Sequence, residues 1–459
     1  MSTNTRPTRP GSIDVTELID TSRITKFHVN LLFWAFLIMV VDGFDLQAIG
    51  YVAPTLIKAW GVSRASFGAA FSAGLVGMMF GASLGGSLGD RLGRKRTVLA
   101  GAVFFGIFTL LTAMSTGLTS LIVLRFIAGI GLGCAVPNAI ALTSEYSPKK
   151  HRATMITVMF LGYTIGAALG GAAAASLIPR FGWTSVFILG GCAPLVVAVL
   201  CQFFLPESVR FQILRKGASA QAKALMQKWF PNAGITADSE LVVREQVRAG
   251  MPFTHLFTEN RAAFTVLLWT CFIVNLITLH FIASWLPTVI SSTGVPLQRA
   301  VIVTSLFQLG GAVGGIIISR LLDRGSLKPL VGFFGLAAVT IASIGQVSSG
   351  AHMLEVVVFA AGLFVVGTQF GLNALAGSSY PTFIRSTGVG WALGVGRVGS
   401  ILGPVVGGIL IALKLPLPYI FLYGAVPMLV GCAASFTLLR LRDKAIERGE
   451  NLAVVAGAH

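Results

Sequence analysis

The sequence predicts an all-α membrane protein in which twelve transmembrane helices form two six-helix bundles. Composition gives the first indication, because 54% of the 459 residues are apolar, only 11% are charged, and the mean hydropathy is +0.82. The second is a series of twelve apolar segments, each close to the roughly 20 residues that cross a bilayer as a helix. The third is a long polar segment after the sixth of them, which divides the chain into two halves.

The first half begins with a polar N-terminal segment, residues 1–26. Its apolar segments are residues 27–52, 66–89, 97–115, 119–143, 154–178 and 183–205. Residues 27–205 therefore form the predicted N-terminal bundle, and the polar residues 206–262 form the central loop.

The second half repeats this arrangement. Its apolar segments are residues 263–287, 300–321, 329–348, 353–378, 387–412 and 418–439. Residues 263–439 form the predicted C-terminal bundle, followed by a tail at 440–459.

Spacing within the halves indicates a duplication. The loop after the fourth segment carries Arg152, and the loop after the tenth carries Arg385. Each arginine is followed at the same two spacings by glycine: Gly166 and Gly170 in one half, Gly399 and Gly403 in the other. Paired halves of this kind are common in transporters, where the site lies between them.

The net charge of +17 is distributed unevenly along the chain. Most of the 34 Lys and Arg lie in the N-terminal segment, the even-numbered loops and the tail. This bias predicts that both termini and the central loop are cytoplasmic, and that the basic residues contact the lipid bilayer rather than nucleic acid. No phosphate-binding loop, metal-ligand spacing or catalytic motif stands out, so we expect no cofactor, no metal site and no enzymatic activity.

Two acids interrupt the first apolar segment. Asp42 and Asp45 lie within the run LLFWAFLIMVVDGFDLQAIGYVAPTL, residues 31–56. A charge near the membrane centre costs about 2.5–3.5 kcal/mol on insertion scales, so such acids usually face a polar cavity. Three residues apart on a helix, they are expected to share one face that looks into a pathway.

The run GGSLGDRLGRKR, residues 85–96, is the most specific short pattern in the sequence. Its small residues allow helices to approach closely, Asp90 can pair with a neighbouring helix, and Arg91 and Arg94 hold the turn in the cytoplasm. The second half echoes it at Asp323 and Arg324. The run resembles the loop between helices two and three of the major facilitator superfamily, which implies two six-helix bundles that rock around a central site.

A narrower resemblance rests on the first and fourth segments. The first contains Asp42-Gly43-Phe44-Asp45, followed by Gln47, Gly50 and Pro54, and the fourth contains Arg125, three glycines, Pro137, Asn138 and Glu145. Both are similar to the aromatic acid:proton symporter family. This resemblance implies import of a benzoate-like or hydroxybenzoate-like anion with protons in the bacterial inner membrane, with the proton as coupling ion.

Proton coupling is assigned to Asp42, Asp45 and Arg125. Two like charges in a low-dielectric cavity favour protonation of one of them, so either acid is a candidate carrier. Alternatively, one acid pairs with an arginine while the other hydrogen-bonds to backbone, or Arg125 extends toward the membrane surface. His280 is a rival proton group, because imidazole titrates near physiological pH.

Substrate binding is assigned first to Arg397, deep in the eleventh segment. Its planar guanidinium suits a carboxylate, although an acid or a carbonyl on a neighbouring helix is an alternative partner. The other candidates are Asn373, Trp391, Phe44, Tyr163 and His280. Asn275, Gln308 and Gln369 are further groups for ring hydroxyls, while packing is the alternative for the aromatic residues.

A third set of charges is expected to control the conformational change at the cytoplasmic side. The set comprises Asp90, Arg91, Arg94, Glu145, Arg152, Asp323, Arg324 and Arg385.

Other functions remain open from the sequence. Proton-driven export of drugs or organic anions would use the same charges, since gradients set the direction. A transporter-like chemoreceptor is a second alternative. We expect a monomer.

Overall fold

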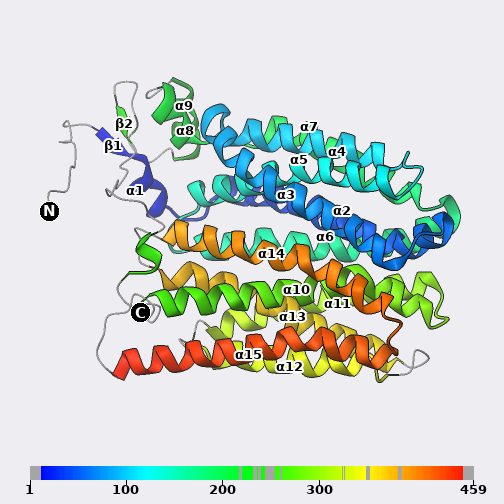
Figure 1. Ribbon diagram of the computed structural model, residues 1–459. Coiled ribbons are helices and arrows are strands. Elements are labelled where there is room, and N and C mark those ends of the chain that lie inside the picture. The colour runs from blue at the N-terminus through cyan, green and yellow to red at the C-terminus, as the bar shows by residue number, and fades with distance from the viewer. Residues whose placement is uncertain are drawn as a thin grey trace.

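Twelve long helices make up most of the computed structural model, and they confirm the predicted fold (Figure 1). The structure describes residues 12–216, 220–230, 235, 239–242, 254–258, 261–322, 324, 326–347, 352–380 and 385–447. Within this part of the chain the long helices run side by side, with the N-terminal six packed beside the C-terminal six.

The helices follow the apolar segments closely. In the first half they are α2 (Lys26–Trp60), α3 (Arg64–Leu92), α4 (Arg94–Thr112), α5 (Leu118–Tyr146), α6 (Arg152–Phe181) and α7 (Thr184–Phe204). In the second half they are α10 (Ala262–Ser292), α11 (Leu297–Leu322), α12 (Lys328–Ile344), α13 (Met353–Ser379), α14 (Arg385–Ala412) and α15 (Leu417–Glu447). Eleven are long and apolar enough to span a membrane, and α12 is a shorter apolar helix of 17 residues, about 26 Å in length.

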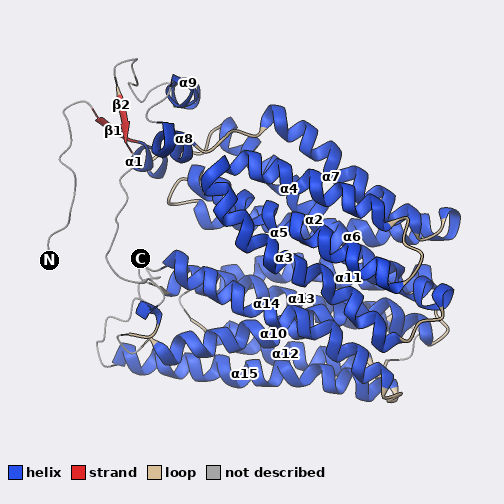
Figure 2. Cartoon of the chain, turned by 45° about the horizontal axis from the view of Figure 1, so that its top comes forward, coloured by secondary structure: helices blue, strands red, loops and turns tan. Residues whose placement is uncertain are grey.

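Small elements gather at one end of the bundles (Figure 2). They are α1 (Val15–Asp20), α8 (Val209–Lys216), α9 (Ala220–Trp229) and the 3₁₀ turn Thr254–Leu256. A parallel pair of three-residue strands, β1 (Ser12–Asp14) and β2 (Glu240–Val242), joins the N-terminal segment to the central loop. This pair is a departure from the all-α prediction. We call this end the α1 end and the opposite end the far end.

The duplication seen in the sequence recurs in the packing of the helices. Gly166 of α6 lies against the backbone of Val40 in α2, and Gly399 of α14 lies against the backbone of Ile273 in α10, both so closely that no Cβ would fit. In each half, therefore, the fifth helix of the bundle packs on the first through the matching glycine.

Several contacts join the two bundles in the half nearer the far end. The Ser72 hydroxyl of α3 donates to the Ile401 carbonyl of α14 at 2.7 Å. The Phe71 ring packs edge-on against Trp285 of α10, with the ring centroids 5.0 Å apart. Gly50 of α2 faces the Ala283 carbonyl, where a Cβ would approach to 3.0 Å. The bundles are thus held together between the middle of the long helices and the far end.

Candidate functional site

Asp45 forms a buried ion pair inside the N-terminal bundle. Arg125 of α5 donates from Nη1 to both carboxylate oxygens, at 3.0 and 2.9 Å, and both side chains are 5% exposed. Thr109 of α4 completes the cluster, because its hydroxyl donates to Asp45 at 3.2 Å and accepts from Arg125 Nη2 at 2.8 Å. The Arg125 guanidinium also lies 5.2 Å from the centre of the Phe187 ring. Arg125 is therefore paired with an acid and does not extend to the membrane surface.

Asp42 has different surroundings, although it lies only three residues earlier on α2. Its side chain is buried, and its Oδ1 makes no hydrogen bond to any described residue. It interacts electrostatically with Arg397 of α14, in the other bundle. The two acids therefore have different partners, because the Asp45 carboxylate is held by Thr109 of α4 and Arg125 of α5.

The two residues between these acids explain how α2 is packed. Gly43 lies so close to the Tyr163 backbone of α6 that a Cβ would overlap its carbonyl. The Phe44 ring fits against Gly170 and Gly190, where a Cβ would come within 3.1 and 3.0 Å of the ring. Phe44 thus packs within the N-terminal bundle and is not brought to Arg397. The half-buried Tyr163 side chain interacts electrostatically with Asp42.

Arg397 is a half-buried cation between the bundles. The flanking glycines set its helix close to α10, with Gly396 against the Phe272 side chain and Gly399 against the Ile273 backbone. Among the described residues, no hydrogen bond or ion pair holds the Arg397 guanidinium. Asp42 and His280 interact with it electrostatically. This arrangement leaves donors available for an anion.

His280 of α10 is fixed by one hydrogen bond. Its Nδ1 lies 3.1 Å from the Leu276 carbonyl oxygen, and a carbonyl only accepts, so Nδ1 carries the hydrogen. In the neutral ring, Nε2 is then an acceptor. The half-buried His280 side chain therefore presents a lone pair near the Arg397 cation.

Three amides form a chain of hydrogen bonds between α10 and α13, which we call the amide relay. Asn275 Nδ2 donates to Gln369 Oε1 at 2.9 Å, and Gln369 Nε2 donates to Asn373 Oδ1 at 3.1 Å. Asn275 is fully buried and its Oδ1 has no hydrogen-bond partner in the described part of the chain. Gln369 and Asn373 are half-buried. Gln369 thus holds the Asn373 side chain directly, and Asn275 in turn holds Gln369.

Trp391 lies apart from these groups. Its side chain is 44% exposed and stacks on Trp269 of α10, with the ring centroids 6.1 Å apart. On α14 it shares an exposed apolar face with Val398 and Leu402. The structure does not bring Trp391 together with Arg397.

The loop charges meet at the α1 end of the N-terminal bundle. Arg94 pairs with Asp90 at 2.6 Å and with Glu145 at 3.5 Å, and Ser208 donates a short hydrogen bond to Glu145. From the sequence, we assigned no role to Pro206-Glu207-Ser208, the segment directly after the sixth helix, although it contributes to this charge cluster. Polar residues at the end of a membrane helix could have indicated such a contact.

Glu207 fastens that segment to α4. Its carboxylate accepts from the backbone N–H of Lys95 at 3.0 Å, and its carbonyl accepts from the Tyr146 hydroxyl at 2.6 Å. Arg152 pairs with Asp20 at the end of α1.

The remaining predicted gating residues are less connected. Arg91 and Arg324 are exposed. Asp323 and the side chain of Arg385 lie outside the described residues.

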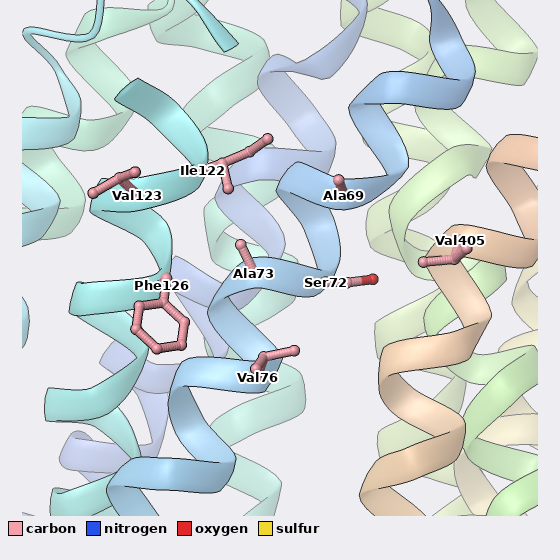
Figure 3. Close-up of a pocket in the computed structure, with 8 residues that line it drawn as sticks. All are labelled: Ala69, Ser72, Ala73, Val76, Ile122, Val123, Phe126 and Val405. Carbon is pink, nitrogen blue, oxygen red and sulfur yellow. The ribbon is translucent and has the colours of Figure 1, made fainter. Parts of the chain in front are cut away.

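A cavity of about 430 Å³ lies at the side of the molecule, between α3, α5 and α14 (Figure 3). Its lining is apolar except for Ser72, whose hydroxyl is already bonded to the Ile401 carbonyl. It contains none of the predicted charged residues. The candidate site therefore consists of Asp42, Arg397 and the amide relay, and this cavity is not part of it.

The chain is similar in sequence to a known protein family and to several transport proteins. The family model described as Major Facilitator Superfamily matches residues 35–396 and 302–454. The gallate transporter of Pseudomonas putida is 38% identical over 431 residues, which cover 94% of this chain and 96% of that protein. The 4-hydroxybenzoate transporter PcaK of Acinetobacter baylyi is 37% identical, with 90% and 91% covered. A benzoate transport protein of the same organism is 33% identical, with 97% and 96% covered.

Solved structures share the fold at low sequence identity. A D-xylose-proton symporter superposes with a TM-score of 0.69 at 16% identity, covering 89% of this chain and 97% of that one. A bacterial homologue of the human lysosomal transporter Spinster, in an inward-facing and unoccupied conformation, gives a TM-score of 0.68 at 16% identity, with 92% and 99% covered. The chain therefore belongs to the Major Facilitator Superfamily and, within it, to the family of these aromatic acid transporters.

Proposed function

We propose that this protein is a secondary active transporter that imports an aromatic carboxylate, of the benzoate or hydroxybenzoate type, together with protons. The observation that carries the proposal is the half-buried Arg397 guanidinium, which no described residue neutralises by an ion pair and which faces Asp42 across the bundle interface. Relatives named for transport of gallate, 4-hydroxybenzoate and benzoate support the substrate class. Membership in a transporter family argues for transport and against an enzymatic function.

Arg397 is the proposed anion site. Its guanidinium offers a planar pair of donors that matches a carboxylate, and the partial burial strengthens that interaction relative to water. A half-buried cation without a paired acid has lost part of its hydration, so a substrate anion would stabilise this region of the protein.

Asp42 is the proposed proton carrier, and Asp45 is not. Asp45 is already neutralised by Arg125 and hydrogen-bonded by Thr109. Asp42 has an unbonded oxygen and interacts electrostatically with Arg397. A substrate carboxylate and an ionised Asp42 compete for the same cation, whereas a protonated Asp42 leaves Arg397 free for the substrate. This competition would couple protonation of Asp42 to binding of the substrate anion at Arg397.

Alternating access would expose this site to each side in turn. The contacts between the bundles at Ser72 and Phe71 close the far side in the present conformation. With both termini in the cytoplasm of a bacterium, as the distribution of Lys and Arg predicts, the far side is the outer face of the inner membrane. The working unit is proposed to be a monomer in the bilayer, with no cofactor besides the coupling proton.

Uptake into proteoliposomes tests this proposal. Labelled 4-hydroxybenzoate and benzoate are supplied with an inward proton gradient, with and without a protonophore. We expect accumulation that the protonophore abolishes. Accumulation that is unaffected by the protonophore would rule out symport, and export of cationic dyes without uptake of either acid would favour a drug exporter instead. Binding without any flux would favour a chemoreceptor.

A further inference from the structure

We propose that the amide relay, Asn275–Gln369–Asn373, recognises a ring hydroxyl of the substrate, so that the transporter selects hydroxylated aromatic acids over unsubstituted ones. This inference rests on the proposed function, because it takes Arg397 as the site of the carboxylate. The side of the substrate ring that lies opposite the carboxylate is then expected to contact α10 and α13.

The relay lies at the same depth in the bundle as Arg397. Gly396 packs on α10 at Leu276, where a Cβ would come within 2.9 Å of the side chain, and Gly399 packs on the backbone of Ile273. Asn275 belongs to that same turn of α10. The relay leads from there along α13, since Asn373 lies four residues, or about 6 Å, beyond Gln369 toward the α1 end.

Hydrogen bonding gives the relay a direction. Asn275 uses its amide nitrogen and Gln369 uses both its oxygen and its nitrogen. Asn373 accepts one hydrogen bond at Oδ1, which leaves its nitrogen and a second lone pair available. A phenolic hydroxyl both donates and accepts, so it can satisfy the half-buried amide of Asn373 in both respects.

The buried end of the relay shows that the network is incomplete as it stands. Asn275 Oδ1 is buried and has no donor among the described residues, a condition that proteins avoid because the desolvated acceptor gains nothing in return. At the other end of the relay, a ligand hydroxyl would pair with the Asn373 amide, whereas unsubstituted benzoate would leave that amide unpaired as well. Leaving polar groups unpaired is what makes a hydrogen-bonding site reject the analogue that lacks the hydroxyl.

The occupant is therefore an anion at one end and a hydroxyl at the other. A cationic ring would be repelled by Arg397, and a wholly apolar ring would leave the relay unpaired. Asn373 is proposed to contact the hydroxyl, whereas Gln369 and Asn275 position the Asn373 amide.

Equilibrium binding to the full-length protein in nanodiscs tests the proposal, with 4-hydroxybenzoate and benzoate as probes. In the unmodified protein we expect 4-hydroxybenzoate to bind at least about tenfold more tightly than benzoate. Asn373→Leu is expected to lose that preference by weakening only the hydroxylated ligand, with benzoate affinity changed by less than about twofold. Asn275→Leu should reduce the preference in part, because it releases the Asn373 amide without removing it.

Thr270→Val serves as the matched control. Thr270 is a polar residue on α10, its hydroxyl donates to the Val266 carbonyl of its own helix, and it lies about 140° around the helix from Asn275. Benzoate binding by each variant shows that the site is folded.

The outcomes separate the two proposals. Equal loss of both ligands in Asn373→Leu, or an unchanged preference, would overturn the hydroxyl assignment and leave the transport function standing. Loss of the preference in Gln308→Leu but not in Asn373→Leu would place the hydroxyl on α11 and would also overturn it. Failure of the unmodified protein to bind either acid would overturn the proposed function and this inference with it.

Discussion

Asp42 and Asp45 show how neighbouring side chains of one type acquire different chemistry. Asp45 is enclosed by Arg125 and Thr109, so its charge is balanced within its own bundle. Asp42 keeps an unbonded oxygen, and the cation it interacts with lies in the other bundle. A charge balanced inside a bundle stays balanced when the bundles move, whereas a charge balanced across the interface changes its surroundings.

Asp42→Asn should therefore abolish proton-driven accumulation while preserving exchange of substrate at equal concentrations. Exchange requires the site to alternate but does not require net proton movement. Labelled counterflow and gradient-driven uptake, measured on the same proteoliposomes, distinguish the two. Normal accumulation by the variant would remove Asp42 from coupling.

Asp45→Asn should instead destabilise the protein, by about 3–5 kcal/mol, because it leaves Arg125 buried without its acid. Chemical unfolding in detergent measures the loss. The double variant Asp45→Asn/Arg125→Gln is the control, and it should recover part of the free energy of unfolding by removing the unpaired charge. A stable single variant that lacks only coupling would contradict the structural role.

Arg397→Ala should weaken carboxylate ligands far more than their neutral analogues, because it removes the cation and leaves the rest of the site in place. Binding of 4-hydroxybenzoate and of its methyl ester to the purified protein provides the comparison. Arg397→Lys is the matched control: it keeps the charge but loses the planar pair of donors, so intermediate affinity is expected. An equal effect on acid and ester would exclude an anion site at this position.

Helices in this protein are positioned by glycines at a few points of close approach. Gly43 on α2 touches the α6 backbone, and the aromatic residue that follows it fills the space beside two further glycines. In the pattern Asp-Gly-Phe-Asp, the two middle residues therefore fix the position of α2, and the position of α2 in turn fixes both carboxylates.

Gly43→Ala should lower the free energy of unfolding by about 1–3 kcal/mol, because the added methyl group overlaps the Tyr163 backbone. Gly332→Ala on α12 is the matched control, since a Cβ there meets no atom within 4 Å. Unfolding in detergent compares the two variants. Equal stability would mean that α2 and α6 can separate without cost.

At the scale of the whole molecule, the two bundles are joined near the far end, while charges gather at the α1 end. Ser72 and Phe71 connect α3 to the C-terminal bundle. At the other end, Arg94 holds Asp90 and Glu145 together within the N-terminal bundle. A change of conformation that separates the bundles at the far end must therefore break the first set of contacts, and we propose that the second set controls the α1 end.

Asp90→Asn should slow transport without changing the equilibrium affinity for substrate, because the residue lies at the α1 end, away from Arg397. Transport rates and binding constants measured on the same preparation test this, with the exposed Arg180→Gln at the far end as control. A collapse of affinity in Asp90→Asn would contradict a gating role.

The sequence by itself determined the twelve helices, their division into halves, and the charged residues that interrupt the apolar segments. Hydropathy is a local property, and a charge in an apolar segment is costly wherever its neighbours lie, so Asp42, Asp45, Arg125 and Arg397 stand out without a structure. What only the tertiary structure decided is which partner each one meets. Each residue turns a helix face by about 100°, and helices distant in sequence supply the partners. For this reason Asp45 could be assigned to Arg125, Trp391 to an exposed face and Asn373 to a chain of three amides only once the helices were packed together.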